Sequence, residues 1–165
     1  MASFEFPDNL HPDCAKVAWL LGTWQGSGHG DYPTIEPYQF GQEVIFTHDG
    51  RPFFHYLSRA WILDENGEKV RDAALETGFL RCRPEGKLEL LLAHNTGFVE
   101  IWHGEAEVAK FELVTDAVVR TESAKEYVAG KRLYGLVEGD LLYAFDMAAM
   151  GQELQPHTWA RLQRS

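Results

Sequence analysis

The residues Gly22-Thr-Trp-Gln-Gly-Ser-Gly-His-Gly-Asp-Tyr-Pro-Thr-Ile-Glu-Pro-Tyr38 decide the fold of this chain. Gly22, Gly26 and Gly28 surround Trp24 in the pattern Gly-x-Trp-x-Gly-x-Gly. Glycine is used where the backbone needs a positive φ or the close approach of another group, and a tryptophan between glycines can bury a large apolar area. The pattern therefore predicts a first strand that seals one end of a β-barrel.

A phosphate-binding glycine loop is the obvious alternative reading of this segment. Such a loop follows an apolar strand and opens a helix. Here the glycines run into Tyr32-Pro-Thr-Ile-Glu-Pro37, where two prolines prevent a regular helix from starting. The strand is therefore the better interpretation.

The composition indicates one globular domain over residues 1–165, because 45% hydrophobic residues can fill a complete core. A net charge of -10 argues against nucleic acid and anionic membrane surfaces as partners. Cys14 and Cys82 form no Cys-x-x-Cys pair, which fits a reducing compartment. With no signal-like or membrane-spanning apolar run, we expect a cytoplasmic protein.

Most of the chain reads as short strands separated by turn residues. One short helix is expected over residues 12–21, where it would cover one end of the fold. Beyond the glycine segment, strands with alternating polarity are expected at 40–48, 53–63, 75–83, 87–94, 98–103, 106–114, 117–122, 126–137, 141–147 and 157–163. The fold class is therefore all-β.

About ten or eleven consecutive strands close most economically into a single antiparallel up-and-down barrel, with a β-sandwich as the alternative. A barrel with more than eight strands is wide enough to leave an internal cavity. We therefore expect the protein to hold a ligand.

The seven histidines show no metal-binding spacing along the chain, although strands could still bring His48, His55 and His94 together around zinc. His157 differs because Pro156 restrains its backbone at the start of the last strand. A neutral imidazole fixed above an apolar cavity can bind a haem iron, whereas the ordinary interpretation is a hydrogen-bonded side chain. Glu76 and Glu100 are candidates for inward-facing polar groups, but an outer solvated face is the commoner place for such residues.

Several blocks of sequence resemble the nitrobindin family, from Leu21 to Leu162. The glycine motif and Tyr-Pro-Thr-Ile (32–35) come first. Phe-Thr-His (46–48), Glu-Thr-Gly-Phe-Leu-Arg (76–81), Ala-His-Asn-Thr-Gly-Phe-Val-Glu (93–100) and Leu-Gln-Pro-His (154–157) follow in the same order. No Gly-x-Ser-x-Gly elbow or catalytic cysteine signature competes with this assignment.

The resemblance implies a lipocalin-like or fatty-acid-binding-protein-like barrel that binds one haem b. It implies His157 as the proximal axial ligand, Thr34 as a haem contact and a distal side without a histidine. It also implies nitric oxide binding, isomerisation of peroxynitrite to nitrate at ferric haem, and protection against or sensing of reactive nitrogen species. A haem-free carrier of a fatty acid or other apolar molecule is the alternative, and a homodimer is a possible assembly.

Overall fold

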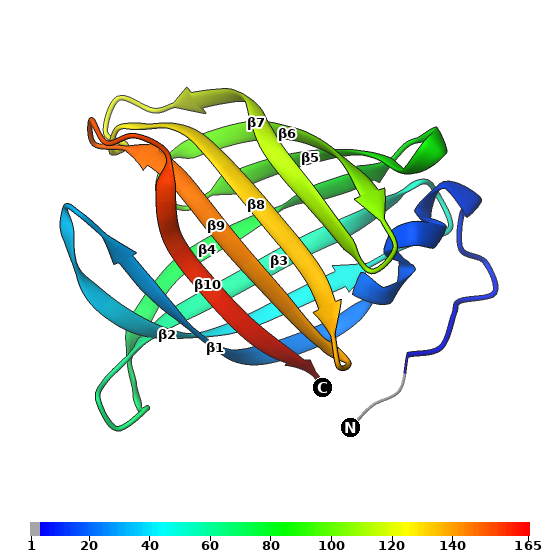
Figure 1. The fold of residues 1–165 in the computed structure, drawn as a ribbon, viewed down its shortest axis with the longest axis horizontal. Helices are drawn as coiled ribbons and strands as arrows, with labels where there is room; N and C mark the ends of the chain where they lie inside the picture. The colour runs from blue at the N-terminus through cyan, green and yellow to red at the C-terminus, as the bar shows by residue number, and fades with distance from the viewer. Residues whose placement is uncertain (1–3) are drawn as a thin grey trace.

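The computed structural model describes residues 4–165 and shows a closed antiparallel barrel (Figure 1). Its ten strands are β1 (Gly22–Tyr32), β2 (Ile35–Thr47), β3 (Phe53–Leu63), β4 (Lys69–Cys82), β5 (Lys87–His94), β6 (Phe98–Glu107), β7 (Lys110–Arg120), β8 (Tyr127–Val137), β9 (Asp140–Ala149) and β10 (Gln155–Arg164). Two short 3-10 helices, η1 (Pro12–Leu20) and η2 (Pro84–Gly86), complete the secondary structure.

The barrel has simple up-and-down topology. Every strand pairs with its neighbours in sequence, and β1 closes the ring by pairing with β10. Gly28 faces Phe40 of β2 on one side and Ala160 of β10 on the other. The predicted all-β barrel is therefore confirmed, and the β-sandwich is wrong.

Two predicted strand boundaries are wrong between residues 98 and 122. β6 continues to Glu107, and the turn falls at Ala109, whose φ of 57° is unusual for a non-glycine residue. β7 then runs through Asp116 without a break, because a register shift next to Ile101 and Trp102 absorbs the extra residue. A bulge of this kind interrupts the alternation of polarity and so imitates a turn in the sequence.

η1 covers one end of the barrel, at the right in Figure 1. Its buried side chains include Cys14, Val17 and Leu20, which belong to the main core. The indole of Trp24 donates a 2.8 Å hydrogen bond to the carbonyl of Leu20, at the last residue of η1. The expected lid is confirmed, as a 3-10 helix, and the tryptophan of the glycine motif holds it in place.

The glycines of the motif allow neighbouring groups to approach β1 closely. A Cβ at Gly28 would lie 2.6 Å from the Phe40 ring and 2.7 Å from the Ala160 side chain. Gly22 has a φ of 124°, which side-chain-bearing residues rarely adopt. The prediction that this segment is a strand whose glycines permit close approach and a positive φ is confirmed.

The expectation of a wide internal cavity is wrong for the middle of the barrel. The space between Phe46, Leu80, Leu113 and their neighbours measures about 10 Å³, close to the room for one water molecule. Large side chains, including fully buried Trp24, Trp102 and Phe54, fill the interior instead. Aromatic residues at inward positions occupy the width that ten strands would otherwise leave open.

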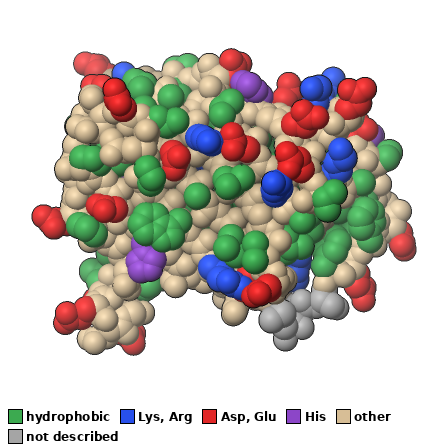
Figure 2. Space-filling model, viewed as in Figure 1, with side chains coloured by type: hydrophobic (Ala, Val, Ile, Leu, Met, Phe, Trp, Pro, Cys, Tyr) green, Lys and Arg blue, Asp and Glu red, His purple; other side chains and the backbone are tan. Residues whose placement is uncertain are grey.

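The outer surface carries both hydrophobic and charged side chains. Figure 2 shows hydrophobic side chains interspersed with acidic and basic ones on the face formed by the last strands and β1. None of the helices in residues 4–165 has the length and apolar character needed to cross a bilayer.

Candidate functional site at the open end of the barrel

The end of the barrel opposite η1 gathers most of the residues that the sequence singled out. The β1–β2 turn with Thr34, the end of β5 with His94, and the start of β10 with His157 all lie there (Figure 1). Antiparallel strands of an up-and-down barrel place alternate connections at the same end, so these distant segments meet. We call this end the open mouth, because neither helix of residues 4–165 covers it.

His157 is turned into the mouth by an irregularity of β10. The pairing with β9 shifts register between Pro156 and Thr158, which leaves His157 as the extra residue. Such a bulge changes the direction in which a side chain points. The imidazole accordingly packs against inward-facing rings, at centroid distances of 5.5 Å to Tyr32 and 5.8 Å to Phe145.

The orientation of the His157 ring is fixed by one hydrogen bond. Nδ1 lies 3.0 Å from the backbone carbonyl oxygen of Asp31. A carbonyl can only accept, so Nδ1 carries the proton and Nε2 of the neutral ring carries the lone pair. Burial lowers the pKa of His157, and the bond to the Asp31 carbonyl opposes only part of this effect.

A neutral, oriented imidazole among aromatic rings fits the needs of a haem-iron ligand. Metal-binding histidines commonly donate their other ring nitrogen to a backbone carbonyl, which fixes the tautomer. The depressed pKa keeps the lone pair of His157 available at neutral pH. The donor chemistry at the mouth therefore suits haem.

Thr34 lies in the exposed turn between β1 and β2, at the same end as His157. Two bulky or charged neighbours of His157 point outward instead. Trp159 stacks on His29 with ring centroids 5.8 Å apart, and Arg161 forms a 2.6 Å ion pair with Asp140. Of these three neighbouring residues, only His157 therefore packs against the inward-facing rings of Tyr32 and Phe145.

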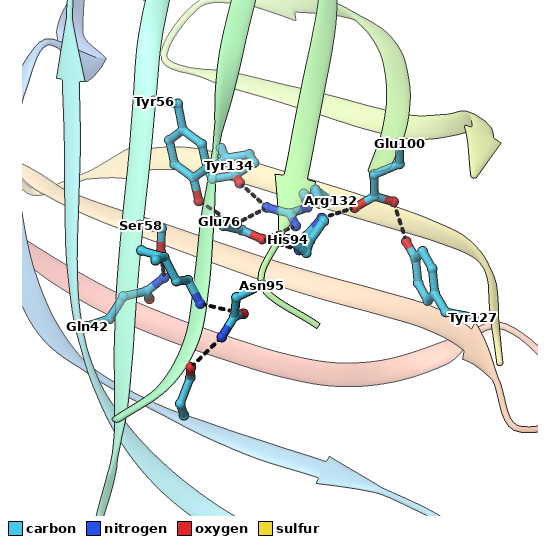
Figure 3. Close-up of polar contacts among 12 residues, drawn as sticks. Gln42, Tyr56, Ser58, Glu76, His94, Asn95, Glu100, Tyr127, Arg132 and Tyr134 are labelled. Carbon is cyan, nitrogen blue, oxygen red and sulfur yellow. Dashed lines mark hydrogen bonds and ion pairs between the residues drawn. The ribbon is translucent and has the colours of Figure 1, made fainter. Parts of the chain in front are cut away.

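Below the mouth, four ionisable side chains form a buried cluster, drawn in Figure 3, which we call the charged cluster: Glu76, His94, Glu100 and Arg132. Arg132 binds both carboxylate oxygens of Glu76, at 2.9 and 3.0 Å. His94 Nε2 lies 2.6 Å from Glu100 Oε1, and its Nδ1 lies 3.2 Å from Glu76 Oε2.

Tyrosine hydroxyls complete the charged cluster. Tyr56 donates to Glu76 at 2.6 Å, and Tyr127 donates to Glu100 at 2.8 Å. Burial opposes the ionisation of Glu76, but the charge and hydrogen bonds of Arg132 outweigh it and lower the pKa of Glu76 to about 2. The cluster is thus a stable arrangement of charges inside the barrel.

The expectation that Glu76 and Glu100 could be inward-facing polar groups is confirmed, and the commoner outer-face interpretation is wrong for both. Both point inward, and Glu100 is 3% exposed. Arg132 and Tyr127 were not singled out by sequence reasoning, although Arg132 lies in phase with the buried Tyr134 on β8. This alternation along β8 is the sequence signal that could have placed Arg132 on the inward face.

The end of the barrel that holds His157 is less apolar than expected. A distal side without a histidine was expected, but His94 lies at the end of β5 on this side of the barrel. His94 stacks on Phe98 with centroids 4.0 Å apart. His48 follows β2 at the other end of the barrel, so the structure separates His48 from His94. The zinc site considered for His48, His55 and His94 is therefore wrong.

A closed ten-stranded barrel with one covered end, and an oriented histidine at the other, defines a β-barrel protein with a candidate ligand site at one end. The chain belongs to the family described as "THAP4-like, heme-binding beta-barrel domain", which it matches over residues 13–164. The family description confirms the expected haem cofactor.

Individual relatives support the same assignment. The chain is 76% identical to a "Peroxynitrite isomerase" of Nocardioides sp. strain JS614, with 98% of each chain covered. It is 45% identical to a "Ferric nitrobindin-like protein" of Streptomyces griseus, covering 97% of this chain and 85% of that one. The crystal structure of Rv2717c from M. tuberculosis matches with a TM-score of 0.85 and 36% identity, over 94% of this chain and 99% of that one. The resemblance to nitrobindins is confirmed.

Proposed function

We propose that this protein is a haem-dependent peroxynitrite isomerase, with His157 as the axial ligand of the iron. The observation that carries the proposal is the hydrogen bond from His157 Nδ1 to the Asp31 carbonyl, which leaves Nε2 free within the mouth. The names of relatives that match nearly the whole chain support peroxynitrite as the substrate.

Each part of the mouth has a role in this proposal. His157 holds the cofactor through Nε2, while Tyr32, Tyr38 and Phe145 pack around the imidazole and restrain it. When bound, ferric haem supplies a Lewis-acidic iron that polarises the O–O bond of peroxynitrite. The side chains orient the cofactor and limit the access of water, and isomerisation to nitrate consumes no net proton.

Further parts of the proposal concern contacts and assembly. Thr34 would contact the haem from the β1–β2 turn, and nitric oxide would bind at the same iron as peroxynitrite. Exposed Trp159 and Phe79, at 45% and 46%, are candidate contacts of a homodimer. The role in protection or sensing and the cytoplasmic location stay predictions.

The haem-free carrier finds little support in the geometry. The space in the middle of the barrel is about 10 Å³, so an enclosed fatty acid would have to displace core side chains. The charged cluster further reduces the apolar surface that such a ligand would need. A ligand bound at the open mouth is not subject to this limit.

The axial-ligand proposal is tested by adding hemin to the purified protein and to His157→Ala. We expect a Soret band in the wild-type protein and its loss or displacement in the variant. His29→Ala is the matched control, since His29 is exposed on the outer face of β1. A Soret band unchanged by His157→Ala would show that another residue holds the iron.

The activity is tested by stopped-flow decay of peroxynitrite with nitrate measured as the product. The hemin-loaded protein should accelerate decay and raise the yield of nitrate, whereas the haem-free protein should not. Decay no faster than in buffer would overturn the isomerase proposal. Stoichiometric lipid in the purified protein would instead favour the carrier.

A further inference from the structure

His94 lies between two buried carboxylates, one at each ring nitrogen. Its Nε2 is 2.6 Å from Glu100 and its Nδ1 is 3.2 Å from Glu76 (Figure 3). The Nε2–Glu100 contact is a hydrogen bond and the Nδ1–Glu76 contact is an ion-pair distance, so a proton on each ring nitrogen would face a carboxylate oxygen, which accepts. A neutral imidazole would turn a lone pair toward one carboxylate. This geometry calls for the imidazolium.

The other contacts of the charged cluster place the shared proton on His94. The second oxygen of Glu100 accepts from the Tyr127 hydroxyl at 2.8 Å, so each oxygen of this carboxyl group has one neighbouring hydrogen-bond partner. Arg132 already neutralises Glu76 through two hydrogen bonds. Two carboxylates, one guanidinium and one imidazolium then sum to zero charge.

No other charged group described around His94 alters this balance. Glu76 faces it from β4 and Glu100 from β6, while Arg132 and Tyr127 approach from β8. The ring of Phe98 covers its face without adding charge. The side chains of His94, Glu76, Glu100 and Arg132 are only 10%, 14%, 1% and 6% exposed, so solvent screens them weakly.

A single ring separates the charged cluster from His157. Phe145 packs 5.8 Å from the His157 ring, and the guanidinium carbon of Arg132 lies 5.0 Å from the centre of the same Phe145 ring. A net charge in the cluster therefore acts across a short, apolar distance on the mouth.

We propose that His94 is a positioning residue of the haem site, whose imidazolium keeps the charged cluster neutral and so permits anions to bind in the mouth. Loss of this proton leaves one uncompensated negative charge behind Phe145, which opposes peroxynitrite and other anions. This inference rests on the proposed function, because it assumes that the mouth holds haem and an anionic substrate.

The first test needs no haem. Nitrogen-15 spectra of the histidine side chains in the haem-free wild-type protein, assigned by through-bond correlation, should show both ring nitrogens of His94 protonated at neutral pH. A neutral His94 tautomer there would overturn the inference, whatever the fate of the haem proposal.

The second test uses azide as an anionic probe of the hemin-loaded protein. His94→Gln should weaken azide binding by about tenfold, because the cluster becomes negative. His103→Gln is the matched control, since His103 is exposed on β6 and lies outside the cluster. Equal azide affinity in wild type and His94→Gln would overturn the inference.

If His94→Gln does not fold, the inference can be tested on the wild-type protein alone. Azide affinity should fall with rising pH over the range in which the His94 spectrum changes, scanned from about pH 5 to pH 9. A fall that does not follow the His94 signal would contradict the inference. Failure to load hemin would instead count against the proposed function, and the haem-free spectra would still decide the state of His94.

Discussion

The imidazole of His157 and the backbone carbonyl of Asp31 are joined by a 3.0 Å hydrogen bond between residues 126 positions apart. The bond links β10 to β1 where both strands leave regular register. It fixes the tautomer of His157 while leaving Nε2 free. Because the acceptor belongs to the backbone, the orientation of the ring does not depend on the side chain of residue 31.

Asp31→Asn and Asp31→Ala should therefore retain haem affinity within about twofold of wild type, as ordinary surface substitutions do. Hemin titration followed at the Soret band measures this. A large loss of affinity in both variants would show that the Asp31 carboxylate itself supports the site.

The depressed pKa of His157 predicts how haem release depends on pH. Burial lowers this pKa below the ordinary value of 6.5, so the ring is neutral at neutral pH and is protonated only in more acid solution. Protonation competes with iron for Nε2. Haem should thus remain bound through pH 6.5 and dissociate at lower pH, which spectrophotometric titration can follow. Release that begins above pH 7 would contradict the orientation and burial described for this ring.

Gly28→Ala should destabilise the barrel by about 1–3 kcal/mol, because the added methyl overlaps Phe40 and Ala160 across two strand pairs. Chemical denaturation of the haem-free protein measures this. Gly135→Ala on β8 is the control, since its Cβ would lie 3.8 Å from the Ala109 oxygen, an ordinary contact. Equal stability of the two variants would refute the close-approach role of the motif.

Glu76→Gln should cost about 3–5 kcal/mol at neutral pH, because it leaves the buried guanidinium of Arg132 without its ionic partner. Glu89→Gln is the control, since the Arg81–Glu89 pair is exposed and should contribute less than about 1 kcal/mol. Denaturant titration of the haem-free proteins compares them. Equal losses in both variants would argue against a structural role of the charged cluster.

The same carboxyl predicts acid sensitivity of the fold. The pKa of Glu76 falls from an ordinary 4.5 to about 2 in the folded protein, so its stabilising effect is complete above pH 4.5 and is lost as the pH falls toward 2. Wild-type stability should therefore decline over this range more steeply than that of Glu76→Gln. Parallel curves for the two proteins would show that Glu76 is not ionised in the folded state.

Local patterns along the chain determined the barrel. Alternating polarity set the inward side of most strands, and the glycine motif marked β1, because both depend on neighbours only a few residues away. The same reasoning was wrong around Asp116, where a bulge interrupts the alternation. The internal cavity was also mispredicted, since the size of opposing side chains enters only when the strands close.

For the candidate site, the sequence by itself determined which histidine deserved attention, through Pro156 and the resemblance of the block that ends at His157. Only the tertiary structure decided where its ring points, because that depends on the β10 bulge and on the carbonyl of Asp31 at the other end of the chain. It likewise assembled the charged cluster from β4, β5, β6 and β8. Charges on separate strands carry no local signature, so their pairing appears only when the barrel closes.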